Sequence, residues 1–148
     1  MTTENSSAKP IVVGVDASPS SVAALRKSQE LATALGAALE VVTVWHFPMT
    51  FDGTNAAEVW SPESEAQEVL AASIGTAFPD GRPKDLTETI IPGPTAGALI
   101  EKSKAAQMLV LGSRGRGGFV GLLLGSVSAV CAQHAHCPVL IMHDATQR

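Results

Sequence analysis

The sequence contains no tyrosine, and aromatic residues of all kinds make up only 4% of its 148 residues. Charged residues account for 16%, whereas about 25% is usual for a soluble domain. Apolar residues make up 45%, and this balance excludes intrinsic disorder across the whole chain. With so few aromatic rings, the core must be built from Val, Ile, Leu and Ala, which suits helices packed closely on a sheet.

Further absences narrow the class of protein. Two cysteines, Cys131 and Cys137, are too few for a disulfide framework, and their apolar neighbours favour structural burial over a redox or metal role. The N-terminus lacks the basic and apolar build of a signal peptide. No uncharged apolar run reaches the roughly 18 residues that a membrane span requires. We therefore expect a cytoplasmic protein that does not associate with a membrane.

Acidic and basic residues are spread unevenly along a chain whose formal net charge is −4. Residues 51–88 hold eight acidic and two basic residues, whereas residues 101–137 hold one acidic and four basic residues. The overall acidity argues against binding to nucleic acid, because such proteins need a basic surface to neutralise phosphates. An anionic ligand would bind in the second region, which includes Arg114 and Arg116.

Strand and helix signals alternate along the chain. Two continuous apolar runs, 11–15 and 108–111, are typical of strands buried on both faces, and residues 39–45 are strand-like through Val41, Val42, Thr43 and Val44. The alternating segment 86–91 favours a strand at a sheet edge, and residues 138–142 form a last strand. Four helices are predicted between these strands, over residues 18–35, 61–78, 95–105 and 125–135.

The regular alternation of strands and helices predicts the α/β fold class. We expect a single doubly wound, Rossmann-like domain over residues 9–143. Its five-stranded parallel sheet has the strand order 3-2-1-4-5, with helices on both faces. Residues 1–8 are expected to form a flexible N-terminus and residues 144–148 a tail.

A glycine-rich segment between a predicted strand and a predicted helix carries the clearest chemical signal. Five glycines lie between positions 112 and 121, more than one turn requires, and Gly125 and Ser126 open the next helix. Glycines let the backbone approach an anion closely, and a helix N-terminus offers N–H groups and a partial positive charge. The hydroxyls of Ser126 and Ser128 can donate to phosphate oxygens. The segment therefore predicts a phosphate-binding site.

Two common phosphate-binding motifs are absent from the positions where they would be expected. The Walker motif requires Gly-Lys-Ser or Gly-Lys-Thr, but Ser126 directly follows Gly125 and no lysine lies between 105 and 148. The dinucleotide-binding motif belongs at the first strand-to-helix turn, where this chain has Gly14-Val15-Asp16 without a glycine cluster.

The pattern Gly112-x-x-Gly115, followed after nine residues by Gly125-Ser126, resembles the nucleotide-binding motif of the universal stress protein family. Val12-Val13-Gly14-Val15-Asp16-Ala17-Ser18 looks like that family's first strand with its terminal acid, and Leu124-Gly125-Ser126-Val127-Ser128 looks like the start of its fourth helix. Cys137-Pro138-Val139-Leu140-Ile141 looks like its last strand. The resemblance covers residues 9–143, with every element in the family's order.

This resemblance implies that the protein binds ATP with Mg²⁺, acts as a nucleotide-dependent regulator in stress response, and forms a homodimer through Val139 to Met142. In such family members the glycine loop and the helix start hold phosphates. An acid at the position of Asp16 lies near the ribose, the phosphates and their metal, and the backbone at the position of Val44 faces adenine. The implied binding residues are Gly14, Val15, Asp16, Val44, Gly112, Ser113, Arg114, Gly115, Gly125, Ser126, Val127 and Ser128.

Several of these residues have plainer interpretations. Asp16 competes with Ser18 for the role of capping the first helix, and a carboxylate beside phosphates requires a bridging cation. Arg114 has the alternative of a solvated loop charge. Trp45 and His46 are expected to pack around the loop that follows their strand. The histidines and cysteines near the C-terminus lack the spacing of a zinc site.

No Ser–His–Asp or Cys–His grouping is recognisable, so the sequence predicts no catalytic residue. Besides a regulatory ATP-binding protein, two alternatives stay open. One is a slow ATPase or autophosphorylating enzyme that uses the same pocket, with Asp16 holding Mg²⁺. The other is a dimeric interaction module with an unused pocket, against which the complete set of motif glycines argues.

Overall fold

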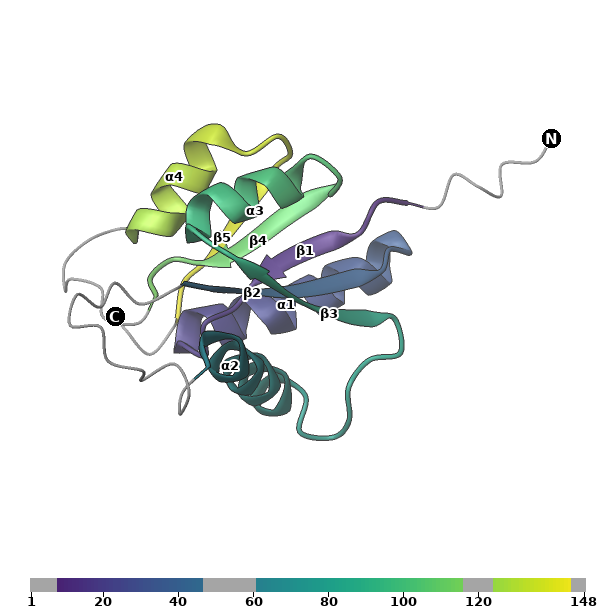
Figure 1. The fold of residues 1–148 in the computed structure, drawn as a ribbon. Coiled ribbons are helices and arrows are strands. Elements are labelled where there is room, and N and C mark those ends of the chain that lie inside the picture. The colour runs from purple at the N-terminus through teal and green to yellow at the C-terminus, as the bar shows by residue number, and fades with distance from the viewer. Residues whose placement is uncertain (1–7, 47–60, 116–123, 145–148) are drawn as a thin grey trace.

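The computed structural model describes residues 8–46, 61–115 and 124–144. The predicted flexible N-terminus, the predicted tail and Arg116 lie almost entirely outside these residues. The elements follow one another along the chain as β1 (Ile11–Gly14), α1 (Pro19–Leu35), β2 (Leu39–Trp45), α2 (Pro62–Ala77), β3 (Leu86–Pro92), α3 (Thr95–Ser103), β4 (Met108–Gly112), α4 (Ser126–His134) and β5 (Val139–Met142) (Figure 1).

The five strands form one parallel sheet in the order β3-β2-β1-β4-β5, which confirms the predicted fold class. Val13 of β1 pairs with Val41 of β2 on one side and with Val110 of β4 on the other. From β1 the chain builds outward to β3, and it then crosses over to β4 on the opposite side of β1. In such sheets a crevice opens at the carboxyl ends of the two strands where the order reverses.

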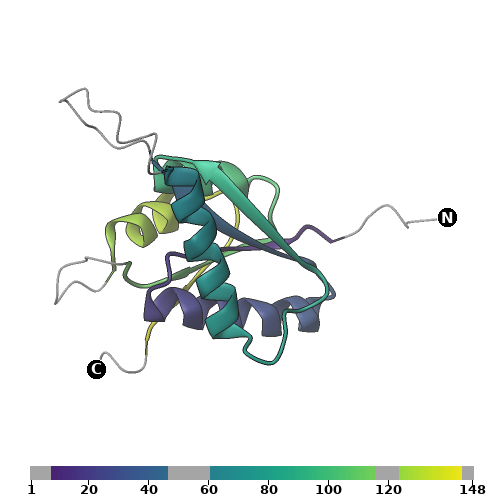
Figure 2. The same cartoon turned by 60° about the horizontal axis from the view of Figure 1, so that its bottom comes forward.

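Helices cover both faces of the sheet, α1 and α2 on one face and α3 and α4 on the other (Figures 1 and 2). Val13 and Val41 lie in a core cluster with residues of α1 and α2. Val12 and Val42 lie in a second cluster with residues of α3 and α4. Because adjacent strand residues point to opposite faces, a sheet covered on both sides requires continuous apolar runs.

The two predicted Ser-Pro helix starts are confirmed. Ser18 caps α1 by accepting a hydrogen bond from the Ser21 amide at 3.4 Å, and Ser61 caps α2 by accepting from the Ser64 amide at 3.3 Å. A proline follows each cap, where its missing N–H costs nothing. Gly36 ends α1 with a φ of 65°, in the left-handed region that glycine adopts readily.

The two edges of the sheet differ in chemistry. β3 is an edge strand, as predicted; its adjacent residues Thr87 and Glu88 are both exposed, and Glu88 forms an ion pair with Arg82. At β5 all four residues are apolar and half-buried. Among the described residues no helix is both long and apolar enough to cross a bilayer.

Candidate functional site

A cavity of about 780 Å³ opens at the carboxyl ends of β1, β2 and β4, where the strand order reverses. The N-terminal halves of α2, α3 and α4 complete its walls. Eleven of the twelve binding residues implied by the sequence line it, Ser113 being the exception: Gly14, Val15, Asp16, Val44, Gly112, Arg114, Gly115, Gly125, Ser126, Val127 and Ser128. The fold thus brings three segments that are distant in the sequence around one space.

The N-terminus of α4 forms one wall of this cavity. Gly125 precedes the helix with extended backbone, and its own amide donates to the Ser113 carbonyl at 2.6 Å. No side chain in the described part of the chain caps the helix, and its first turn contains no acidic residue. Ser126 and Val127, the first two residues of the helix, line the cavity. Their N–H groups and the helix dipole favour an anionic ligand there.

Hydrogen bonds of Ser113 and Ser128 hold this wall together. Ser113 is 2% exposed, and its carbonyl accepts from the Ser128 hydroxyl at 3.1 Å as well as from the Gly125 amide. Its amide donates to the Met142 carbonyl of β5 at 2.8 Å. These bonds anchor the end of β4 to both α4 and β5. A direct contact of either serine with a ligand stays a prediction.

Asp16 forms the opposite wall, at the turn between β1 and α1. Its Oδ1 accepts a hydrogen bond from the Ser18 amide at 3.0 Å, and the Ser18 hydroxyl in turn accepts from the Ser21 amide. Both side chains therefore stabilise this turn. A Cβ at position 115 would lie 2.7 Å from Asp16 Oδ2, so only glycine lets the loop come this close to the carboxylate. Ala17, between Asp16 and Ser18, has a φ of 69°, a strained conformation of a kind that occurs often at functional sites.

The packing beneath the cavity requires a glycine at position 112 and is tight at Gly14. A Cβ on Gly112 would lie 2.7 Å from the Ser20 carbonyl carbon and the Ser21 amide nitrogen, which are backbone atoms of α1. A Cβ on Gly14 would lie 3.0 Å from Leu111 Cδ2. Both glycines therefore have a packing reason that is independent of any ligand.

The charges around the cavity suit an anion that carries its own cation. Arg114 and the N-terminus of α4 favour negative charge, while Asp16 contributes a carboxylate to the same space. Within the described ranges no three His, Cys, Asp or Glu side chains are grouped to hold a metal ion. Mg²⁺ commonly uses one or two carboxylates together with phosphate oxygens, and the Asp16 carboxylate, which shares the cavity with the start of α4, is a ligand of that type.

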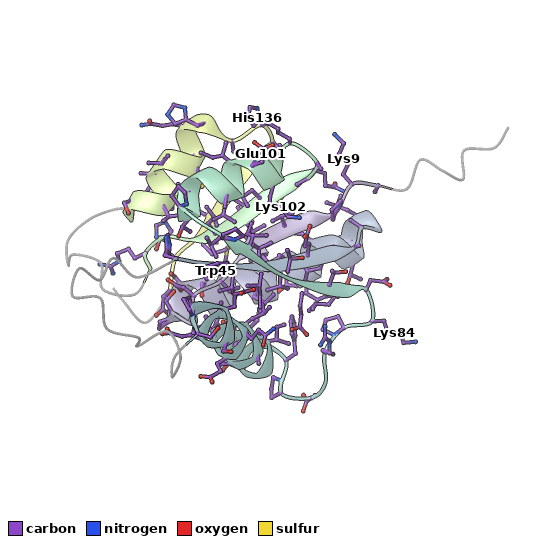
Figure 3. All side chains as sticks on the ribbon, in the orientation of Figure 1. Lys9, Trp45, Lys84, Glu101, Lys102 and His136 are labelled. Atoms are coloured by element: carbon purple, nitrogen blue, oxygen red, sulfur yellow. The ribbon has the colours of Figure 1, made fainter. Side chains whose placement is uncertain are left out.

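The cavity also has a wall that we did not predict. Trp45 and His46, which we expected to pack around the following loop, line it, and Trp45 is seen at the carboxyl end of β2 in Figure 3, away from Lys9 and Lys84. His46 Nε2 lies 2.9 Å from Thr95 Oγ1 at the start of α3. From α2 come residues at helical spacing: Pro62, Glu65, Ala66 and Val69. That spacing marks one helix face, but it does not indicate what the face covers.

The two cysteines lie away from this cavity. Cys131 in α4 is fully buried, and burial raises the pKa of its thiol to about 11. Cys137 is half-buried, and burial raises the pKa of its thiol as well, against smaller opposing effects from a backbone hydrogen bond of Leu109 and the charge of Lys9. A protonated thiol is a poor nucleophile and metal ligand.

Fold and site together define a doubly wound α/β domain with a ligand cavity at the carboxyl edge of its sheet and an open helix N-terminus beside it. A sequence model described as the universal stress protein family matches residues 7–143, and the chain belongs to that family.

Individual relatives and solved structures that resemble this chain are also universal stress proteins. A universal stress protein of Mycolicibacterium smegmatis is 34% identical over 137 residues, covering 90% of this chain and 45% of its own length. The chain spans about half the length of the curated relatives it matches. The universal stress protein UspA from Lactobacillus plantarum has a similar fold, with a TM-score of 0.73 at 20% identity over 93% of this chain and 99% of its own. A universal stress protein in complex with cAMP gives a TM-score of 0.67 at 28% identity over 95% and 100% of the two chains.

Proposed function

We propose that this domain binds an adenine nucleotide, that ATP with Mg²⁺ is the ligand, and that binding serves regulation in the cytoplasm rather than rapid turnover. The observation that carries the proposal is the convergence of Asp16, the Gly112–Gly115 loop and the open N-terminus of α4 around one cavity. A solved family member of 28% identity was crystallised with cAMP, which supports an adenine nucleotide as the class of ligand.

The phosphates fit best at the start of α4. There the amides of Ser126 and Val127 and the positive end of the helix dipole favour negative charge, and Arg114 lies on the same side. Gly115 packs closely against the Asp16 carboxylate, so the glycine loop and the acid border the same cavity. A Mg²⁺ ion bound by the phosphates would be held by the Asp16 carboxylate and would remove the repulsion between the two anionic groups.

The base fits best against the apolar part of the cavity. Val44 and Leu99 lie on the α3 side, and Ala66 and Val69 lie on the α2 side, while Gly14 forms part of the floor. A cavity of about 780 Å³ falls within the usual range for small-molecule sites, roughly 300–1,000 Å³. The backbone of Val44 is expected to face the adenine ring.

Calorimetric titration tests this function directly. The purified domain is titrated with ATP in Mg²⁺ and in EDTA, and then with cAMP, AMP and GTP. Saturable binding of ATP that weakens in EDTA is expected, and an absence of binding at millimolar ATP would overturn the proposal. Phosphate release in the same samples separates a regulator from a slow ATPase.

We also propose that the domain forms a homodimer through β5. This strand is an edge of the sheet, and its residues Val139–Met142 carry no charge that would protect it from pairing. The other edge, β3, carries charged side chains. Light scattering at low protein concentration should give twice the chain mass, and a monomer at every concentration would contradict the dimer.

A further inference from the structure

Ser20, in the first turn of α1, makes bonds that the proposed binding site does not itself explain. The residue is 1% exposed. Its hydroxyl donates to the Arg114 carbonyl at 2.7 Å and accepts from the Arg114 amide at 3.4 Å. The Ser18 hydroxyl adds a longer contact, 3.4 Å, to the same carbonyl. One buried side chain therefore holds both backbone polar groups of a loop residue that lies 94 positions away in the sequence.

Arg114 lies between Gly112 and Gly115, where the position of the backbone matters most. At one end of this segment Gly112 packs directly on the backbone of Ser20, and at the other end Gly115 lies against the Asp16 carboxylate. Gly125 packs against the segment, since a Cβ at that position would be 3.5 Å from Arg114 Cα. The path of the loop past Arg114 therefore sets the spacing between Asp16 and the start of α4.

We propose that Ser20 is a positioning residue for phosphate binding, fixing the Arg114 backbone so that Asp16, Gly115 and the start of α4 face one ligand together. This inference rests on the proposed binding of an adenine nucleotide. Ser20 itself is not among the described residues that line the cavity, so it acts through the loop. Its contribution is pre-organisation, because a loop that is already ordered loses less conformational freedom when the ligand binds.

The test compares Ser20→Ala with Ser28→Ala. Ser28 is a matched control, since it is fully buried in the same helix and, among the residues that the structure describes, its hydroxyl bonds only to the Leu25 carbonyl of that helix, at 2.8 Å. Each variant and the unaltered protein are titrated with ATP in Mg²⁺ and with adenosine, which has no phosphate. Hydrogen exchange of the Arg114 amide is followed in the same three proteins.

Ser20→Ala should weaken ATP binding by about three- to tenfold, the effect expected for one lost hydrogen bond, while the affinity for adenosine stays unchanged. The Arg114 amide should exchange faster in this variant alone. The proposal is overturned if Ser20→Ala binds ATP normally, if ATP and adenosine weaken equally, or if Ser28→Ala shows the same loss. If the unaltered protein binds no ATP, the proposed function fails, and this inference fails with it.

Discussion

Helices α1 and α4 both begin at the carboxyl edge of the sheet and both border the same cavity, yet their first turns are completed in different ways. At α1, Ser18 caps the helix and Asp16 accepts from the Ser18 amide. At α4 the cap position holds Gly125, and no described side chain caps the helix. One N-terminus has an amide, that of Ser21, capped by a side chain, whereas the other has no described side-chain cap and borders the cavity with Ser126 and Val127.

This difference divides the chemistry of the site. A capped helix start such as that of α1 needs no ligand, so its contribution is the carboxylate of Asp16 and a rigid surface against which the glycine loop packs. An uncapped start such as that of α4 gains stability from a bound anion. Two helices of the same fold thus supply the cation-binding side and the phosphate-binding side of one proposed site. The following substitutions change one side at a time.

Replacing Gly112 by Ala should have the largest effect, on stability. The new Cβ would lie 2.7 Å from backbone atoms of Ser20 and Ser21, so α1 would have to shift away from β4. We expect the free energy of unfolding to fall by about 2–3 kcal/mol. Urea denaturation followed by circular dichroism measures the loss. Gly125→Ala is the control, because its Cβ would meet its nearest atoms at 3.5 Å, and an equal loss in both variants would contradict this explanation.

Replacing Gly125 by Asp should make α4 resemble α1. The extended backbone at Gly125 and the surrounding space accept a side chain, and its carboxylate can cap the first turn. We expect ATP affinity to fall about 30-fold, or about 2 kcal/mol, because the carboxylate would compete with the phosphates and repel them. Gly125→Asn provides a cap without a charge and should lose less. Calorimetric titration measures both, and unchanged ATP binding by Gly125→Asp would place the phosphates elsewhere.

Replacing Asp16 by Asn tests the proposed cation-binding side of the site. Asn can still accept from the Ser18 amide, so the turn before α1 should remain intact. In Mg²⁺ we expect ATP affinity to fall about tenfold, or about 1.4 kcal/mol, since the cation loses a carboxylate. In EDTA the variant should bind ATP at least as tightly as the unaltered protein, because the repulsion is gone. If Mg²⁺ strengthens ATP binding equally in both proteins, Asp16 has no role in holding the metal.

The smallest expected effect is on the pH dependence of stability, and it concerns Cys131 in the buried part of α4. Burial raises the pKa of Cys131 to about 11 in the folded protein, above the value of about 8.5 expected for the unfolded chain. The protonated thiol therefore contributes stability that is complete below about pH 8.5 and is lost as the pH rises toward 11. The free energy of unfolding should decline more steeply over this range in the unaltered protein than in Cys131→Ala. Parallel curves would show that this thiol does not titrate differently on folding.

Most of the fold could be predicted from short-range signals. Ser18-Pro19 and Ser61-Pro62 marked the starts of α1 and α2, because capping depends on atoms a few residues apart. Gly36 marked the end of α1 for the same reason. Gly125-Ser126 marked the start of α4, which has no side-chain cap among the described residues, since a helix start depends on a local pattern.

The packing reasons behind the site could not be predicted in this way. Gly112 was predicted as a residue of a binding motif. The structure shows a second reason for glycine there, because a Cβ would clash with the backbone of Ser20 and Ser21. The α2 face that contains Glu65 and Ala66 has helical spacing, which is equally consistent with an ordinary core face. The hydrogen bonds of Ser20 with Arg114 join residues 94 positions apart, and no local pattern reports such a pair.

The sequence by itself determined the scarcity of charge and aromatic rings, the apolar runs that become β1, β2 and β4, the helix caps and the glycine motif. All of these depend on a residue and its near neighbours. Tertiary structure alone decided that Trp45 and one face of α2 complete the cavity, and that Ser20 holds the loop between Asp16 and the start of α4. The physical reason is that the crossover from β3 to β4 brings the two halves of the chain together, and the resulting contacts depend on how strands pair.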